Sequence, residues 1–301
     1  MNLFDRLIAA SLPITPKPIV RHFARPYLAG ETLEDMVRTV DGINADGFLC
    51  AVSILGEFVT QREESEAAVR EYKEVLDTIQ SRKLNSNIHI KLSHMGMKLD
   101  MEFCYQNVRT LLTHAREHSN FVRLDMEDSS MTSDTLDMYE RLTEEFDNVG
   151  VVIQACLRRS LEDARRLSKI KANVRVVKGI YIEPRNISFH DREIIRSSYV
   201  RIVEELLGAG CYVAIATHDE RLVYEGCDTV DRLGLDPSQY EFQMLLGVDA
   251  PLRRIIRDAD HRLRVAVPFG AKWYPYSLRR LRENPTVAGY VFKAVINPPK
   301  G

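Results

Sequence analysis

Eight short apolar runs, rich in β-branched residues, alternate with helical patterns along most of the chain, and this alternation limits the possible folds. The runs are residues 47–55, 87–93, 121–127, 149–155, 173–179, 211–217, 240–246 and 262–268. Amphipathic segments such as residues 63–80 and 191–208 separate them, with apolar residues at helical spacing. Strands that alternate with helices pair in parallel through right-handed crossovers. Eight such units favour an α/β fold of the closed (β/α)8 barrel type over an open sheet.

The 301 residues fit one such domain, because barrels of this type are single domains of this size. We therefore expect residues 1–301 to form a single (β/α)8 barrel domain. Residues 1–45 precede the first strand and are predicted to form an N-terminal helical extension. Residues 273–285 follow the last strand and are predicted to form a final helix over the barrel mouth.

Charge, hydropathy and cysteine usage exclude several classes of protein. The net charge is −2, with no basic tract, so nucleic acid is not an expected partner. No stretch approaches the roughly 20 apolar residues that span a bilayer, and Asp5 and Arg6 interrupt the apolar run that a signal peptide needs. Five scattered cysteines fit a reducing cytoplasm, with buried thiols predicted at Cys50, Cys156 and Cys211.

Polar side chains interrupt or end seven of the eight predicted strands near their carboxyl ends. They are Glu57, Lys91, Asp125, Glu127, Gln154, Arg175, Lys178, Thr217, His218 and Gln243. One such residue is often a solvated rim group or a structural ion pair. A set spread over seven strands instead predicts a shared concave site at the barrel mouth, because chemistry in this fold collects there.

Motifs for other chemistries are missing from the sequence. There is no G-x-x-x-x-G-K-[ST] phosphate loop, no H-E-x-x-H zinc motif and no G-x-S-x-G nucleophile elbow, and no metal site is predicted. The G-x-G of residues 208–210 precedes a predicted strand, so it does not indicate a Rossmann nucleotide site. His89 alternates with Ile88 and Ile90, and this alternation favours a histidine side chain that faces outward.

The final helix carries polar residues at a spacing that apolar residues use to face a core. Tyr276, Arg279, Arg280 and Glu283 stand at positions i, i+3, i+4 and i+7. A charged helix face is usually solvated. Two adjacent guanidinium groups next to an aromatic ring are also well suited to hold a carboxylate, and because the helix follows the last strand it begins at the mouth.

These strings, taken together, resemble the proline dehydrogenases, which are flavin enzymes that oxidise proline. Residues 274–285, YPYSLRRLRENP, resemble the terminal Y-x-x-R-R-x-x-E motif of that family. Seven further blocks match in the same order: ILGE (54–57), HIKLSHMG (89–96), VRLDMED (122–128), VVIQA (151–155), VRVVKGIY (174–181), IATHDE (215–220) and YEFQMLLG (240–247). The resemblance covers roughly residues 40–290, and the chain length is similar to that of the monofunctional bacterial enzymes.

The resemblance implies FAD bound across the barrel mouth. Arg175 resembles the arginine that lies near flavin N5 and tunes its reduction. Asp125 and Met126 resemble the pair on the third strand that lies at the flavin and the substrate. The remaining residues that the resemblance implies at the cofactor are Gln154, Val177, Lys178, Gly179, Ile180, Tyr181, Thr217, His218, Gln243 and Leu245.

For the substrate, the resemblance implies that Arg279 and Arg280 bind the carboxylate of proline. The other implied substrate contacts are Lys91, Asp125, Leu245, Ala266, Tyr276 and Glu283, and the implied catalytic residues are Arg175, Asp125 and Lys91. Hydride would pass from ring C5 to flavin N5, giving Δ1-pyrroline-5-carboxylate. The family also implies a quinone as electron acceptor and a transient contact with a separate pyrroline-5-carboxylate dehydrogenase. The expected location is the cytoplasm, either free or peripheral at the inner face of the membrane.

Two positions depart from the family pattern. Ala266 stands in RVAVPFG where the family usually carries tyrosine, and Ile180 replaces the alanine of VKGAY. The missing phenol ring should enlarge the pocket, so 4-hydroxyproline or another substituted imino acid is an alternative substrate. Two other classes stay open, namely a Schiff-base lyase that uses Lys91 or Lys178 and a non-catalytic barrel that binds imino acids.

Overall fold

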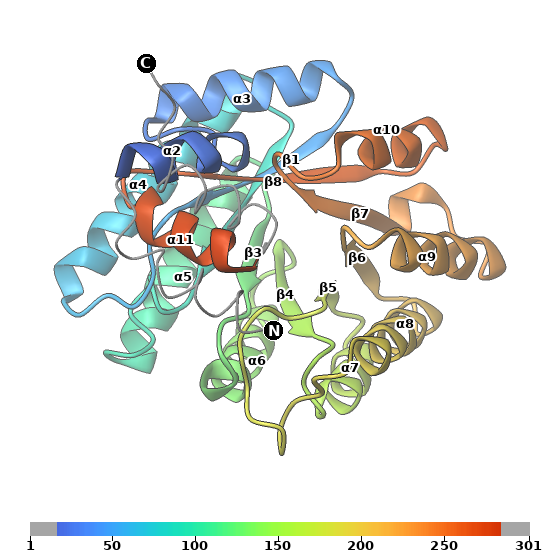
Figure 1. The fold of residues 1–301 in the computed structure, drawn as a ribbon. Coiled ribbons are helices and arrows are strands. Elements are labelled where there is room, and N and C mark those ends of the chain that lie inside the picture. Colours follow the sequence, from blue (N-terminus) through green and yellow to red (C-terminus); the bar gives the residue numbers. More distant parts are fainter. Residues whose placement is uncertain (1–16, 284–301) are drawn as a thin grey trace.

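Residues 17–283 of the chain are described in the computed structural model, and they contain a closed parallel barrel with strand order β1 to β8 (Figure 1). The strands are β1 (Leu49–Ile54), β2 (Ser86–Lys91), β3 (Val122–Asp125), β4 (Val149–Gln154), β5 (Asn173–Val177), β6 (Tyr212–Ala216), β7 (Tyr240–Leu245) and β8 (Leu263–Phe269). Each strand overlaps one of the eight predicted runs, so the predicted (β/α)8 barrel is confirmed.

Helices surround the barrel in the figure (Figure 1). They are α2 (Lys17–Ala24), α3 (Leu33–Ala45), α4 (Arg62–Ser81), α5 (Met101–Glu117), α6 (Thr132–Thr143), α7 (Ser160–Ser168), α8 (Arg192–Gly208), α9 (Glu220–Arg232), α10 (Ala250–Asp258) and α11 (Trp273–Glu283), with 3-10 turns η2 (Arg25–Tyr27), η3 (Ser129–Met131) and η4 (Pro237–Gln239). Helices α4 to α10 each follow one of the strands β1 to β7, which is the alternation that the sequence predicts.

Helix α3 occupies the place in the ring beside β8 and β1, and it contacts both strands. Its apolar stripe, which includes Met36 and Val40, is fully buried. A capping box fixes its start: Thr32 Oγ1 accepts from the backbone N–H of Asp35, and the Asp35 carboxylate accepts from the backbone N–H of Thr32. Because α3 fills this place, α11 lies elsewhere and packs against α2.

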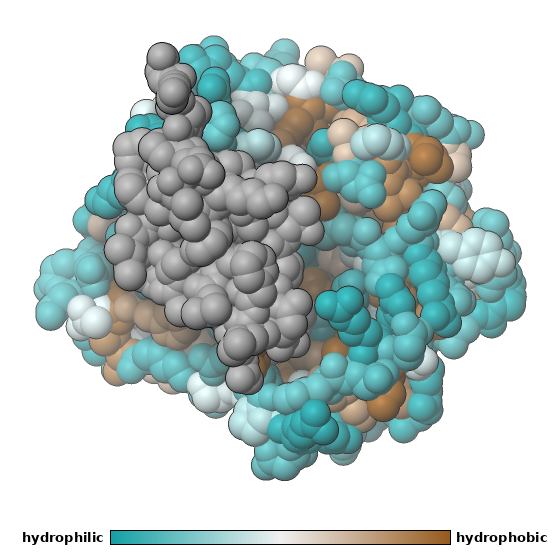
Figure 2. Space-filling view, in the orientation of Figure 1, coloured by the Kyte–Doolittle hydropathy of each residue, from teal (hydrophilic) through white to brown (hydrophobic). Residues whose placement is uncertain are grey.

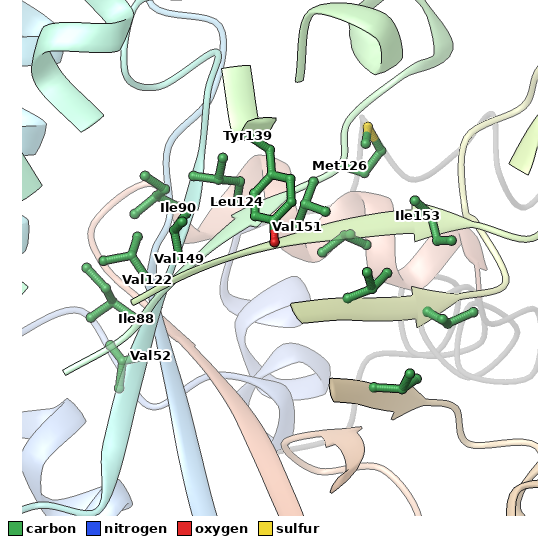
Figure 3. Close-up of a cluster of buried hydrophobic side chains, with 14 of the residues drawn as sticks. Val52, Ile88, Ile90, Val122, Leu124, Met126, Tyr139, Val149, Val151 and Ile153 are labelled. Atoms are coloured by element: carbon green, nitrogen blue, oxygen red, sulfur yellow. The ribbon is translucent and has the colours of Figure 1, made fainter. Parts of the chain in front are cut away.

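On each strand, every second residue packs an apolar side chain against the helices. Ile88 and Ile90 of β2 lie next to Val122 and Leu124 of β3 in this layer, together with Tyr139 of α6 (Figure 3). All five side chains are buried. The residues between them face the inside of the barrel, and most of the polar side chains of the strands are among these.

Charged side chains fill the barrel interior on the amino-terminal side of the predicted site residues. Arg264 Nε donates to both carboxylate oxygens of Glu241, at 2.9 and 3.0 Å. Arg123 donates to the backbone and side-chain oxygens of Asn173, at 2.9 and 2.7 Å. A Cβ atom at position 150 would overlap the Arg123 guanidinium, so Gly150 makes room for it. The interior is thus held by paired polar groups, which are costly to leave without their partners.

His89 belongs to this interior, so the outward orientation predicted for it is wrong. The residue is 3% exposed, and its Nδ1 lies 3.6 Å from Asp125 Oδ1. The prediction failed because both faces of a barrel strand are buried, and Ile88 and Ile90 are the ones that pack against the helices. Burial, and next the positive charge of Arg175, hold the pKa of His89 well below its ordinary value, so the ring is neutral.

On the face shown in Figure 2, hydrophilic residues predominate over the described helices, with apolar residues scattered among them. Among residues 17–283, none of the helices has both the length and the apolar character needed to cross a bilayer. The thiols of Cys50, Cys156 and Cys211 are free and buried, as predicted, and so is that of Cys104.

Candidate active site

A cavity of about 260 Å³ opens at the carboxyl ends of the strands, and every strand contributes to its lining. Its lining includes most of the residues that the sequence implied at a cofactor or substrate: Lys91, Asp125, Met126, Gln154, Arg175, Val177, Lys178, Gly179, Ile180, Tyr181, Thr217, His218, Gln243, Leu245, Ala266 and Tyr276. Residues from distant parts of the sequence therefore share one concave surface at the barrel mouth.

Asp125 ends β3 and faces two nitrogen-bearing side chains. Its Oδ1 atom lies 3.6 Å from Arg175 Nη1 and 3.6 Å from His89 Nδ1. The Asp125 and Arg175 side chains are 24% and 21% exposed, so both charges are partly desolvated yet reachable from the cavity. Arg175 Nε is buried and makes no hydrogen bond within the described part of the chain. The guanidinium therefore has donor capacity left for a bound group.

Lys91 lies beside Asp125, because the two residues are partners in the register of β2 and β3. Its Nζ atom is 3.5 Å from Glu57 Oε2, in the segment that follows β1. The two side chains are 20% and 25% exposed, so solvent screens their attraction less than at an open surface. This pairing holds the ammonium group at the cavity wall.

The loop after β5 is anchored to the two helices that follow it, α8 and α9. Asp219 accepts from Lys178 Nζ at 3.1 Å and from Arg196 Nε at 2.9 Å, which ties the loop to α8 and to the start of α9. Gly179 has a φ of +99°, and a Cβ atom there would overlap Cys156 Sγ. Only glycine fits this backbone without strain. The loop is thus fixed where its backbone can approach a ligand closely.

Three side chains, from β4, from the segment after β6 and from β7, present hydrogen-bonding groups at the mouth. Gln154 Nε2 donates to the backbone oxygen of Glu127 at 2.7 Å. His218 Nε2 accepts from the backbone N–H of residue 245 at 2.7 Å, which assigns its proton to Nδ1. Gln243 Nε2 donates to Glu241 Oε1 at 2.6 Å, while its own Oε1 is buried without a partner among the described residues.

The opposite side of the cavity is less polar. Leu245 of β7 and Ala266 of β8 are register partners, and both line the cavity. Tyr276 lines it from α11 and is 8% exposed, because it packs with Leu55 and Trp273 in a small apolar cluster. This cluster fixes the start of α11 at the mouth.

The predicted carboxylate clamp falls at the end of the same helix. The backbone of Arg279, Arg280 and Glu283 is part of α11, in agreement with the predicted helix. Their side chains lie outside the described part of the structure, as do residues 1–16 and 284–301. Their placement at the substrate stays a prediction.

Seven cavity residues were not among those predicted for the site: Ser53, Leu55, His89, Val152, Ala216, Met244 and Pro268. Several of them stand two positions from a predicted residue on the same strand. His89 precedes Lys91 in this way, and Val152 precedes Gln154. The two-residue period of a strand is the signal that would have identified them.

Glu127, which the sequence groups with the mouth residues, does not line the cavity. It is 1% exposed, and its carboxylate accepts from the backbone N–H and the hydroxyl of Ser93, at 2.9 and 2.5 Å. Burial raises its pKa above the ordinary value. Glu127 therefore connects β3 to the segment after β2, a structural role.

A larger cavity of about 410 Å³ lies between α4 and the turn after β8, and four glutamates contribute to its lining. It contains none of the predicted site residues. We place the candidate active site at the mouth cavity because charged, hydrogen-bonding and apolar groups from all eight strands converge there.

The sequence matches a family model described as proline dehydrogenase over residues 36–292. It is 34% identical to proline dehydrogenase 1 of Bacillus subtilis strain 168 over 273 residues, covering 91% of this chain and 90% of that protein. It is 31% identical to the proline dehydrogenase of Deinococcus radiodurans over 300 residues, covering 95% of this chain and 97% of that protein. A match to bifunctional protein PutA of Escherichia coli K12, at 24% identity, covers 90% of this chain but 24% of that protein.

Among solved structures, the fold is similar to that of proline utilization A (PutA) from Bdellovibrio bacteriovorus inactivated by N-propargylglycine. The TM-score is 0.82 at 22% identity, and the match covers 93% of this chain and 34% of that one. A PutA mutant from Bradyrhizobium japonicum gives a TM-score of 0.72 at 20% identity, covering 89% of this chain and 32% of that one. At this identity the structural likeness supports the barrel fold alone.

Proposed function

This chain belongs to the proline dehydrogenase family and is an oxidoreductase that acts on the CH–NH group of proline, and we propose that FAD bound across the barrel mouth is its cofactor. The family is generally flavin-dependent. The observation that carries the proposal is the convergence of the implied cofactor residues on one cavity. The relatives give no specific support to a Schiff-base lyase or to a non-catalytic binding barrel.

The residues present fit a flavin. Its ring carries hydrogen-bond donors and acceptors along one edge, and the mouth offers both kinds of group. Gln243 Oε1 is a buried acceptor, and Arg175 Nε is a buried donor. Neither atom has a hydrogen-bond partner in the described chain. Such groups are costly to bury unless a ligand satisfies them. Lys178 and the tight backbone at Gly179 suit the more exposed, phosphate-bearing part of the cofactor.

When bound, FAD supplies at flavin N5 the hydride acceptor for C5 of the substrate ring. The amine of proline loses a proton and becomes an imine nitrogen, so the product is Δ1-pyrroline-5-carboxylate. In our proposal the Asp125 carboxylate faces the amine and stabilises the positive charge that grows there. Arg175 stabilises the negative charge that develops on the cofactor side, and Lys91 contributes a fixed positive charge at the substrate.

The proposal can be tested by anaerobic titration of the purified protein. We expect a yellow protein that releases FAD on denaturation and whose visible absorbance is bleached by L-proline. A colourless protein trapped by borohydride with a carbonyl substrate would instead indicate Schiff-base chemistry. A yellow protein that no imino acid reduces would indicate a binding barrel.

Ala266 leads us to propose a pocket that also accepts a ring-substituted proline. It lines the cavity opposite Leu245, and no aromatic ring fills that place on β8. We expect trans-4-hydroxy-L-proline to bleach the flavin at a rate within about tenfold of the L-proline rate, because one hydroxyl or methylene discriminates by only 10–200-fold even in a tight pocket. Ala266→Tyr should lower the hydroxyproline rate more than the proline rate. A strong preference of the unmodified protein for proline would refute the wider pocket.

The arginine pair of α11 gives a second expected result. Arg279→Met and Arg280→Met should each raise KM for proline by about 10–100-fold, because a charge-assisted hydrogen bond contributes roughly 1.5–3 kcal/mol. FAD content should not change. Arg201→Met, on the exposed face of α8, is the matched control for loss of one surface charge. Unchanged KM in both α11 variants would exclude them as the carboxylate clamp.

We further propose a quinone as the electron acceptor, and a separate pyrroline-5-carboxylate dehydrogenase as the consumer of the product. The second proposal is supported by the match to PutA, a protein described as bifunctional of which this chain corresponds to 24%. A second activity in that protein can lie outside the matched part. Rates with a soluble quinone and with O₂ after proline reduction would test the acceptor.

A further inference from the structure

We propose that Asp77, His114 and His118 form a binding site for a divalent transition metal of the Zn²⁺ class on the outside of the barrel. Asp77 lies on α4, His114 lies on α5, and His118 caps the end of α5. One ligand atom from each residue lies within 4.8 Å of the others. This cluster takes no part in the proposed proline chemistry.

The three ligand atoms converge on one point. Asp77 Oδ1 is 2.6 Å from His114 Nε2 and 2.8 Å from His118 Nε2. Imidazole nitrogens and a carboxylate oxygen bind Zn²⁺ at about 2.0–2.2 Å, and three protein ligands commonly leave a fourth position to water. The Asp77 side chain is 56% exposed, so a small rotation can open the space that an ion needs.

The two histidines are arranged as a chelating pair. They stand four positions apart in the string HAREH, so their side chains lie on the same side of α5. Their rings make a T-shaped contact with centroids 4.9 Å apart, and both Nε2 atoms face Asp77. Glu117 Oε2 lies 3.6 Å from the other nitrogen of His114. A carboxylate on the far side of the ring is the arrangement that orients metal-bound histidines in proteins.

The donor set of one carboxylate and two imidazoles is open to solvent. The His114 and His118 side chains are 17% and 22% exposed, so an ion from solvent can reach them.

The site would join two neighbouring helices of the barrel. Helices α4 and α5 pack against each other (Figure 1), and the cluster lies at the carboxyl-terminal ends of both. Each helix runs back from the mouth, so this end is the one opposite the cofactor cavity. The ion would link residues 37 positions apart in the sequence and thereby stabilise the fold. The same Asp–His hydrogen bonds could bridge the helices without an ion, and metal titration separates the two cases.

The experiment uses the full-length flavoprotein without a histidine tag, stripped with EDTA and desalted. ZnCl₂ titrated by calorimetry should bind at one site per chain, and saturating Zn²⁺ should raise Tm by several degrees. Asp77→Asn and His118→Gln should each weaken this binding at least tenfold and remove the Tm shift. Asp147→Asn and His190→Gln, both exposed and outside the cluster, are the matched controls and should bind as the unmodified protein does.

Copper gives a direct reading of the ligands. With one Cu²⁺ per chain, the electron paramagnetic resonance spectrum should show coupling to two imidazole nitrogens, reduced to one in His114→Gln. Zn²⁺ binding that survives in Asp77→Asn and His118→Gln, or no binding up to 1 mM Zn²⁺, would overturn the proposal. Bleaching of the flavin by L-proline should be equal in Asp77→Asn and the unmodified protein, so this test is independent of the proposed proline chemistry.

Discussion

Replacing Arg175 with methionine is expected to slow the reduction of the bound flavin by proline by about 10²–10³-fold, the usual cost of losing one preorganised electrostatic group at a reacting centre. Arg175 is the cationic side chain beside Asp125. Its Nε–H group donates no hydrogen bond to any residue of the described chain. In the proposed site, its guanidinium would favour the more negative form of the cofactor. The midpoint potential of the bound flavin should therefore fall together with the rate, and anaerobic stopped-flow and spectroelectrochemistry measure the two effects.

The Arg175 result needs two controls, because the residue also lies among buried charges. Arg175→Lys keeps a positive charge and should recover part of the rate and most of the potential, whereas Arg201→Met on α8 should alter neither. FAD content and thermal unfolding show whether the barrel and its cofactor remain intact. A variant with full FAD occupancy, normal potential and normal rate would exclude Arg175 from the chemistry.

The barrel could be predicted from the sequence because its signal is local and repeated. Polar residues interrupt or end seven of the eight apolar runs, and each run can be recognised without knowledge of the others. The direction of each side chain is a different matter. His89 and Ile90 alternate on a strand whose two faces are both buried, so periodicity alone does not tell which of them faces the inside. Similarly, periodicity does not tell that α3 packs beside β8 and completes the ring of helices, because that place is decided by tertiary packing.

Much of the candidate site was predictable for the same reason, since strand ends meet at one mouth. The interactions that hold it were not. Asp219 gathers Lys178 and Arg196 from separate elements, and Asp77 meets His114 across 37 positions. Such pairs depend on how helices and loops pack, and neither composition nor spacing within one element contains that information.

Replacing Glu241 with alanine is expected to lower the free energy of unfolding by about 3–5 kcal/mol, the range for breaking a buried ion pair from one side. Glu241 is 1% exposed, and both its oxygens accept from Arg264 Nε. The variant leaves the Arg264 guanidinium inside the barrel without its counter-charge. Arg123 is also near, because in the unmodified protein its charge acts on the same Glu241 carboxylate. With an unfolding entropy of roughly 0.6 kcal/mol per degree for a chain of this length, Tm should drop by about 5–8 °C.

Thermal unfolding of Glu241→Ala should be compared with Glu66→Ala, an exposed position on α4 where the change should be within about 0.5 kcal/mol. A Tm loss no larger than that of Glu66→Ala would show that solvent or neighbouring groups already neutralise Arg264. The pH dependence gives a second reading. Burial raises the pKa of Glu241, but the attraction of Arg264 outweighs it, so the folded-state pKa lies below the unfolded one. Its contribution to stability is therefore present above the ordinary glutamate pKa and is lost as pH falls through the lower folded-state value.

A double-mutant cycle separates the value of the ion pair from the cost of leaving one charge alone. Glu241→Leu and Arg264→Leu should each destabilise the barrel strongly, because each leaves one buried charge unpaired. The double variant should be more stable than the sum of the single losses predicts, since it removes both charges and their desolvation cost. Arg264 Nη1 also donates to the backbone oxygen of Cys50 at 2.7 Å, so the double variant should still lose some stability relative to the unmodified protein. Strict additivity would mean that the two side chains act independently, and that the interior is stabilised by its separate hydrogen bonds and not by the charge pair.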